Sequence, residues 1–241
     1  MRSLAFALVL TLSFASSAAA QRATCTDLSD AEVRARTAVI ERAIRQEEPA
    51  VRRWWSSFAL LHAVMATGTA ILAASAQDEP FRNEMLVNMT SSTLGLATLV
   101  VFLPPLMGGG DAMRAQRADT PEARLHRLRV GEGILARAAA STDFLRSWVP
   151  ATLSTLYVTA AASTLLLAFE RAQGAILHSA GGAVLGLGRI LLHPTGARDR
   201  WRRYLRAHPD AACDEAPIAT PIEPRAALVP HGLGLGLRVD F

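Results

Sequence analysis

Lysine is absent from this 241-residue sequence, so all 25 of its basic residues are arginine. The absence excludes chemistry that needs a lysine amine, including Walker A phosphate loops, Schiff-base aldolases and pyridoxal enzymes. Charged residues make up only 19% of the chain and apolar residues 51%, whereas soluble domains carry about 25% charged residues. This composition excludes a disordered chain and argues against an ordinary soluble domain.

Cysteine is also scarce, with Cys25 and Cys213 as the two examples. Neither has a CxxC partner or a nearby histidine pair, which argues against a zinc site. In an exported protein the two predict one disulfide, the alternative being two unpaired thiols. Catalytic patterns such as GxSxG and HExxH are missing as well. We therefore predict that the protein is not an enzyme and has no metal, cofactor or small-molecule ligand.

The first twenty residues carry the pattern of a cleavable secretory signal. Arg2 supplies the positive start, an apolar stretch runs from Leu4 to Phe14, and residues 18–20 are small alanines. This pattern predicts export and a mature chain that begins at Gln21. The alternative is an uncleaved signal anchor.

Four charge-poor apolar stretches follow, at residues 55–76, 85–107, 149–169 and 174–192. Each is 19–23 residues long, the length needed to cross a hydrocarbon core of about 30 Å. They suit either transmembrane helices or the buried helices of a soluble bundle. We favour the membrane, because four stretches of spanning length are hard to accommodate in one small soluble core.

Small residues recur within these stretches at helical spacings. Ala66, Ala70 and Ala74 lie four residues apart, and Gly182 and Gly186 form a GxxxG pair. Small side chains let helices approach closely in a membrane. We therefore predict that these five residues pack against neighbouring helices.

The polar stretches contain start signals for amphipathic helices. Ser29 followed by Glu32 forms a capping box. Thr120 followed by Pro121 joins a capping threonine to a proline at the first helical position. Pro49 is expected where the first transmembrane helix begins.

Tryptophans beside arginines indicate where the apolar stretches meet the lipid headgroups. Trp54, Trp55 and Trp148 occupy such positions. Residues 197–207 place Trp201 and Tyr204 on one side among five arginines. This segment is predicted to be an interfacial helix or, alternatively, a helix that packs on the other polar helices.

The C-terminal region differs from the rest of the chain. Residues 209–230 contain five prolines, which predicts an extended tether. Apolar residues stand at every second position of residues 232–241. This period of two predicts a strand that docks back on this protein or adds to a partner's sheet. A frayed tail is the alternative.

Together these features predict an all-α integral membrane protein. Its core is a four-helix bundle of two helical hairpins, with amphipathic extramembrane helices and a short strand-like tail. The predicted order is a signal peptide (1–20), an amphipathic helix (21–54), a first transmembrane hairpin (55–107), an amphipathic linker helix (108–147), a second transmembrane hairpin (148–193), an interfacial helix (194–208) and a proline-rich tail (209–241).

Two topology signals conflict. Four crossings place 21–54, 108–147 and 194–241 on one face with 21 arginines, and leave Arg82 and Arg171 on the other. The positive-inside rule puts the arginine-rich face in the cytoplasm. The signal peptide puts the same face, and both mature termini, on the periplasmic or extracellular side. We favour the signal peptide.

Polar residues inside the apolar stretches are the candidates for function, because ionisable groups at membrane depth are costly. His62, His178 and Arg189 are the ionisable ones, and Asn88 and Thr90 are neutral. We predict a structural or scaffolding protein that associates through its helices with itself or with a membrane protein partner. The alternative is a small transporter or channel with a polar path lined by His62, His178 and Arg189. Nucleic acid is not expected, because acidic residues are interspersed among the arginines and aromatics are few.

Overall fold

The computed structural model describes residues 28–212, 225–231 and 234–240. The predicted signal peptide, Gln21, Cys25 and Cys213 lie outside these residues. The helices are α1 (Asp30–Ser75), α2 (Glu79–Val101), α3 (Gly109–Arg114), α4 (Pro121–Leu145), α5 (Trp148–Leu167), α6 (Ala172–Leu191) and α7 (Gly196–Ala207), followed by the 3-10 turn η1 (Pro209–Ala212). Strands β1 (Arg225–His231) and β2 (Gly234–Asp240) complete the described chain.

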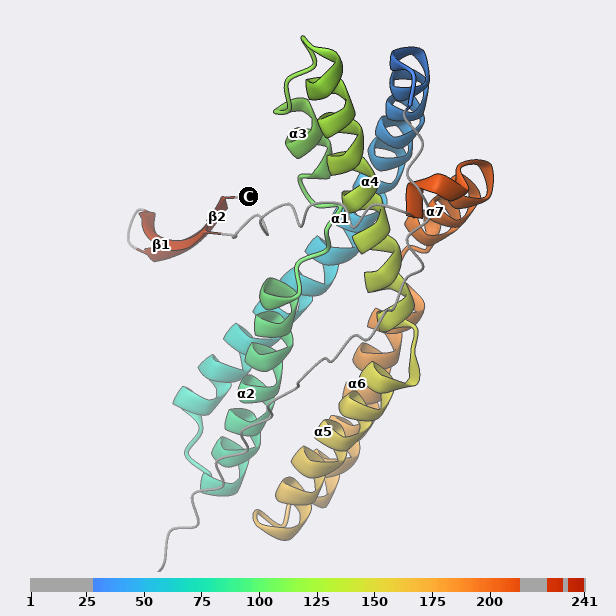
Figure 1. Cartoon of the computed structure of the whole chain (residues 1–241). Helices are drawn as coiled ribbons and strands as arrows, with labels where there is room; N and C mark the ends of the chain where they lie inside the picture. Colours follow the sequence, from blue (N-terminus) through green and yellow to red (C-terminus); the bar gives the residue numbers. More distant parts are fainter. Residues whose placement is uncertain (1–27, 213–224, 232–233, 241) are drawn as a thin grey trace, which may run out of the picture.

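Figure 1 shows two regions with different packing. The first part of α1 joins α3, α4 and α7 in a region that we call the head. The rest of α1 pairs with α2 in the first hairpin, and α5 pairs with α6 in the second hairpin. Four helices of the described chain are long and apolar enough to span a membrane: α1, α2, α5 and the α6 region.

Helix α1 runs unbroken through both regions and continues across residue 54, the predicted boundary between the amphipathic helix and the first hairpin. Its 46 residues include Pro49, which lies inside the helix instead of at its start. A proline here removes only the hydrogen bond to the Arg45 carbonyl. Ile44 and Val51 are buried on either side of it and hold the helix together. At 1.5 Å per residue, α1 extends about 69 Å from the head to the far end of the first hairpin.

The predicted capping signals begin α1 and α4. The Glu32 amide donates to Ser29 Oγ at 3.3 Å, and the Ala123 amide donates to Thr120 Oγ1 at 3.2 Å. The second half of the capping box is absent, because the Glu32 carboxylate accepts from Arg36 instead of reaching back to Ser29.

The head has an ordinary hydrophobic core. Ile40, Leu128 and Leu135 are fully buried between α1 and α4. The two helices approach closely at Gly131, where a Cβ would lie 2.8 Å from Ile40 Cγ2. The remaining apolar side chains of this core come from α3, α7 and the segments beside them, including Leu106, Met113, Ala197 and Tyr204.

Helix α7 packs on the head through its aromatic side. Tyr204 is buried and donates a hydrogen bond to the buried carboxylate of Glu132. Trp201 stacks on Tyr204 with ring centroids 5.6 Å apart and also packs against the head core. The head therefore covers the aromatic face of α7, as the packing alternative for residues 197–207 expects.

The C-terminal strand pairs with the segment directly before it. β1 and β2 form an antiparallel ladder whose register runs from Arg225↔Asp240 to His231↔Gly234. Part of the predicted proline-rich tether is therefore a strand. Pro230 fits because each strand of a two-stranded sheet is an edge strand, where a missing N–H can be tolerated.

A partly buried ion pair joins α1 to η1 and predicts acid sensitivity of the head. The Arg36 guanidinium is 2.7 Å from Asp210 Oδ2 and, through this hydrogen bond, lowers the pKa of that carboxyl. Because this carboxyl has a lower pKa in the folded protein than in the unfolded chain, its charged form stabilises the fold at pH values above the unfolded pKa of about 4. This stabilisation is lost as the pH falls through the folded-state pKa. We expect urea denaturation in detergent to show the head weakening below about pH 4. Asp210→Asn should cost about 1 kcal/mol at neutral pH and flatten this acid limb.

The control for this prediction is Asp111→Asn. Asp111 also pairs with an arginine, but its side chain is mostly exposed. Its substitution should leave the dependence of stability on pH unchanged. If Asp210→Asn also leaves this dependence unchanged, the acid sensitivity does not come from the Arg36–Asp210 pair.

Candidate functional site

One face of α2 carries a stripe of polar and small residues. Glu84, Asn88, Ser91, Gly95 and Thr98 are spaced four, three, four and three residues apart. At 100° per residue, all five lie within about 40° of one line along the helix. The stripe covers about 21 Å of the helix axis, most of the thickness of a hydrocarbon core.

Four members of this stripe bind side chains of the second hairpin. Arg171 Nε donates to Glu84 Oε2 at 2.8 Å, and Tyr157 Oη donates to Ser91 Oγ at 2.8 Å.

The other two contacts involve residues that the sequence singled out. His178 Nδ1 lies 2.7 Å from Asn88 Oδ1, and Arg189 Nη1 donates to Thr98 Oγ1 at 2.8 Å. We call these four pairs, together with His62 and Gly95, the polar seam. Along the seam the two hairpins meet through hydrogen bonds and one ion pair.

His62 reaches the seam from α1 through a gap left by Gly95. A Cβ at position 95 would lie 2.6 Å from His62 Nδ1 and overlap the ring. Gly95 lies three residues before Thr98, the partner of Arg189, so the imidazole lies near the head end of the seam.

All three residues predicted to line a polar path therefore lie on one seam. Each keeps one buried nitrogen without a hydrogen-bond partner: His62 Nδ1, His178 Nε2 and Arg189 Nε. Asn88, which the sequence also indicated, is a seam residue. Six seam residues were not predicted from the sequence: Glu84, Ser91, Gly95, Thr98, Tyr157 and Arg171. The spacing of residues 84, 88, 91, 95 and 98 was a readable signal for the α2 stripe.

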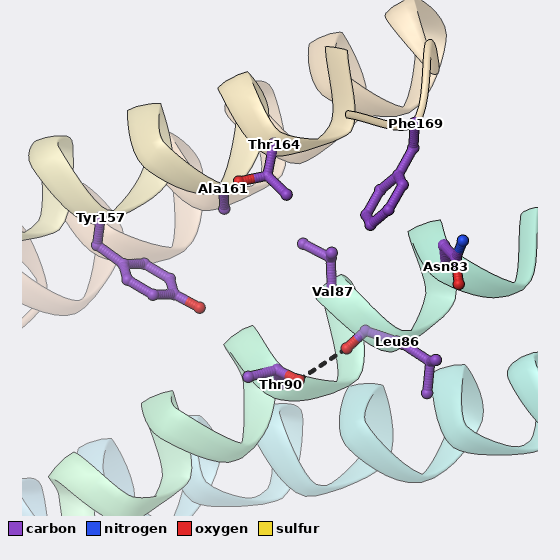
Figure 2. Close-up of a pocket in the computed structure, with 8 residues that line it drawn as sticks. All are labelled: Asn83, Leu86, Val87, Thr90, Tyr157, Ala161, Thr164 and Phe169. Atoms are coloured by element: carbon purple, nitrogen blue, oxygen red, sulfur yellow. Dashed lines mark hydrogen bonds between the residues drawn. The ribbon is translucent and has the colours of Figure 1, made fainter. Parts of the chain in front are cut away.

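A shallow groove of about 260 Å³ lies beside the seam between α2 and α5. Figure 2 shows Tyr157 at one end and Phe169 at the other, with Val87 and Ala161 on facing walls. Thr90 lies in this groove and donates its hydroxyl to the Leu86 carbonyl, so it takes no part in the seam. His62, His178 and Arg189 do not line this groove.

Side chains at the junction between the head and the hairpins donate hydrogen bonds to last-turn carbonyls of α2 and α6, the two helices whose C-terminal ends lie at this junction. Trp54 Nε1 donates to the Arg189 carbonyl at 3.1 Å, and Trp55 Nε1 donates to the Leu99 carbonyl at 3.0 Å. Arg146 Nη2 donates to the Leu191 carbonyl at 3.3 Å. We call this arrangement the junction clamp. Trp54 is only 8% exposed and serves as a helix-end donor, a role different from the headgroup anchor expected from the sequence.

The predicted small-residue contacts fall in two places. Gly182 and Gly186 face α5, where a Cβ at Gly182 would lie 2.6 Å from Val158 Cγ2 and one at Gly186 would overlap Ser154 Oγ.

On α1, Ala66 and Ala70 are half-buried, Ala73 is buried and Ala74 is exposed. A strict four-residue repeat drifts about 80° over two steps, whereas residue 73 lies within about 20° of residue 66. For this reason the buried position falls on Ala73 and not on Ala74.

Gly95→Ala should destabilise the first hairpin by about 1–3 kcal/mol, because the added methyl group displaces the His62 ring from its site. Thermal unfolding in detergent measures this loss. Gly68→Ala is the matched control, since a Cβ there meets nothing within 4 Å. If Gly95→Ala is as stable as Gly68→Ala, His62 does not depend on the gap.

The residues described here carry no group of three or more histidine, cysteine, aspartate or glutamate side chains that could hold a metal ion. The seam therefore consists of hydrogen-bonded pairs that join two hairpins, with three free ring or guanidinium nitrogens along it. Comparisons of the chain with family models, with curated proteins and with solved structures found no match.

Proposed function

We propose that this protein is a multi-pass integral membrane protein with a structural role, which associates with a second copy of itself through its helices. The observation that carries the membrane assignment is an inversion of the usual packing between head and hairpins. In the head, apolar side chains are buried and most arginines are exposed. In the hairpins, large apolar side chains face outward while polar side chains pair inward.

The outward apolar side chains cover all four helices of the hairpins. They include Leu60, Val64, Ile71, Val101, Leu156, Leu167, Ile176, Leu177, Val184 and Leu191, each more than half exposed. Contiguous apolar surface on this scale is unusual for a soluble monomer. Lipid tails cover such a surface, and hydrogen bonds between helices hold polar side chains away from lipid.

Alkaline carbonate extraction of membranes that contain the full chain tests this assignment. We expect the protein to stay in the membrane pellet and to need detergent for release. Recovery in the carbonate supernatant would overturn the membrane proposal and favour a soluble bundle.

Association is supported by the outer face of α6. Leu177, Gly181, Val184, Gly188 and Leu191 follow a 4-3-4-3 spacing, and the three large side chains are exposed. A Cβ at Gly181 or Gly188 would meet nothing within 4 Å. Alternating small and large residues on one stripe are self-complementary, because the side chains of one copy fit over the glycines of the other. A second copy of this chain is therefore the proposed occupant.

The variant Gly181→Leu/Gly188→Leu tests this contact. We expect crosslinking in membranes to show a dimer for the natural chain and about a tenfold weaker dimer for the variant, with thermal stability in detergent retained. A dimer of unchanged strength would rule out this face. A natural chain that is monomeric in membranes would overturn the association proposal itself.

A transport role is the second candidate, because His62, His178 and Arg189 share one seam and each keeps a free buried nitrogen. Proteoliposomes loaded with a pH-sensitive dye test it. Proton flux that disappears in His62→Ala/His178→Ala would favour transport over a structural role. Flux equal to that of empty liposomes would exclude proton transport.

The orientation follows from the signal peptide and is part of the proposal. We propose export, with the head and both mature termini on the periplasmic or extracellular side. Reporter fusions at residues 80, 130 and 215 test it. Residues 130 and 215 should report the outer side and residue 80 the cytoplasm, whereas the reverse pattern would follow the arginine distribution.

A further inference from the structure

Two arginines near the end of α6 have no carboxylate partner among the residues in the structure. Arg146 donates to the Leu191 carbonyl, and Arg189 donates to Thr98 Oγ1. The Leu191 carbonyl lies two residues beyond Arg189 in the last turn of α6, so both arginines reach the same helix end. A guanidinium has five N–H donors, and each of these arginines uses one of them in the described contacts.

By contrast, four arginines of the head each bind a carboxylate on another element: Arg36, Arg124, Arg127 and Arg200. The C-terminal ends of α2 and α6 offset part of the positive charge, since each helix end carries only about half a negative charge. Several donors at this junction are left for an external acceptor.

The surroundings of these arginines are apolar and uncovered. Trp148 is 75% exposed, Val101 73%, and Phe102 and Leu192 are each 69% exposed. Phe102 and Leu192 directly follow the ends of α2 and α6. We call these four residues the apolar collar. A free inorganic anion gains nothing from such a surface, whereas a molecule with a charged head and apolar chains engages both parts.

We propose that an anionic phospholipid binds at this junction, with its phosphate between Arg146 and Arg189 and its acyl chains along the apolar collar. A guanidinium binds a phosphate through charge-assisted hydrogen bonds, and this bonding does not depend on which side of the membrane the junction faces. The proposal rests on the membrane location proposed above. It adds a ligand class and two residues that recognise it.

Nanodiscs that differ only in lipid charge test the proposal. The full chain is reconstituted in phosphatidylcholine alone and in phosphatidylcholine with one third phosphatidylglycerol, and its melting temperature is measured in both. We expect the anionic lipid to raise the melting temperature of the natural chain by about 5 °C. In Arg146→Gln/Arg189→Gln, the difference between the two lipids should fall by at least half.

The comparison between lipids separates binding from folding. A variant that merely weakens the junction lowers the melting temperature equally in both lipids, and an equal lowering would overturn the proposal. Arg203→Gln/Arg206→Gln is the matched control, because it removes the same charge from two exposed arginines of α7. If this control loses the lipid difference as fully as the junction variant does, the effect is general surface charge and the site is refuted.

Two further outcomes are decisive. In detergent, sodium phosphate or glycerol phosphate should not stabilise the natural chain, and stabilisation equal to that by phosphatidylglycerol would replace the phospholipid with a soluble anion. A chain that inserts into nanodiscs without any lipid difference overturns this inference alone. A chain that fails to insert overturns the proposed membrane location.

Discussion

Gly182→Leu/Gly186→Leu should separate α5 from α6 and unfold the second hairpin. Both glycines face α5, and leucine side chains at these positions would collide with Val158 and Ser154. Val158 is β-branched and has few rotamers in a helix, so it cannot swing aside without cost. Overpacking at two positions should cost about 2–6 kcal/mol in total. Thermal unfolding in detergent, followed by circular dichroism, measures the loss.

The outer glycines of the same helix provide the control. Gly181→Leu/Gly188→Leu adds the same two side chains to α6, but each points into open space. This control should lose less than about 1 kcal/mol, because surface substitutions in a helix rarely cost more. Equal stability of the two double variants would show that α5 does not pack on the inner glycines.

Trp54→Ala should be the most damaging single substitution at the junction clamp. The indole is buried beside Phe58 and lies nearly perpendicular to the His193 ring, with ring centroids 4.7 Å apart. Its N–H donates to the Arg189 carbonyl. Truncating a buried tryptophan costs about 3–5 kcal/mol. The variant also exposes a last-turn carbonyl of α6, so we expect cleavage by an added protease to increase at residues 192–196.

Two substitutions separate the contributions at this position. Trp54→Phe keeps most of the apolar contact and removes the N–H donor, and it should cost about 1–2 kcal/mol. Trp148→Ala removes an indole that is 75% exposed, and in detergent it should cost less than about 1 kcal/mol. A Trp54→Ala protein as stable as Trp148→Ala would contradict the clamp.

Local patterns in the sequence were sufficient to predict much of the helical arrangement. Thr120 and Pro121 begin α4 as predicted, because a capping hydroxyl and a proline at the first position act within one turn. The four apolar stretches predicted four helices, since length and composition are local properties. The prediction failed at Pro49, where burial on both sides of the proline outweighs one lost hydrogen bond.

The candidate site was only partly visible in the sequence. His62, His178 and Arg189 stand out because ionisable residues are rare in apolar stretches. Their partners on α2 and α5 are common polar residues such as Ser91 and Tyr157, which become significant only when two helices face each other. Glu84 and Arg171 also escaped notice, because charges at the ends of apolar stretches are expected to face water.

The sequence by itself determined where α1 and α4 begin, which helices are apolar enough to span a membrane, and that Gly182 and Gly186 share a face. These properties depend on neighbours within about two turns. Only the tertiary structure decided that His62 occupies the gap at Gly95, that adjacent tryptophans bind two different helices, and that α7 packs on the head. Such contacts join residues 33–153 positions apart in the chain, and they form because buried donors must find acceptors wherever the fold places them.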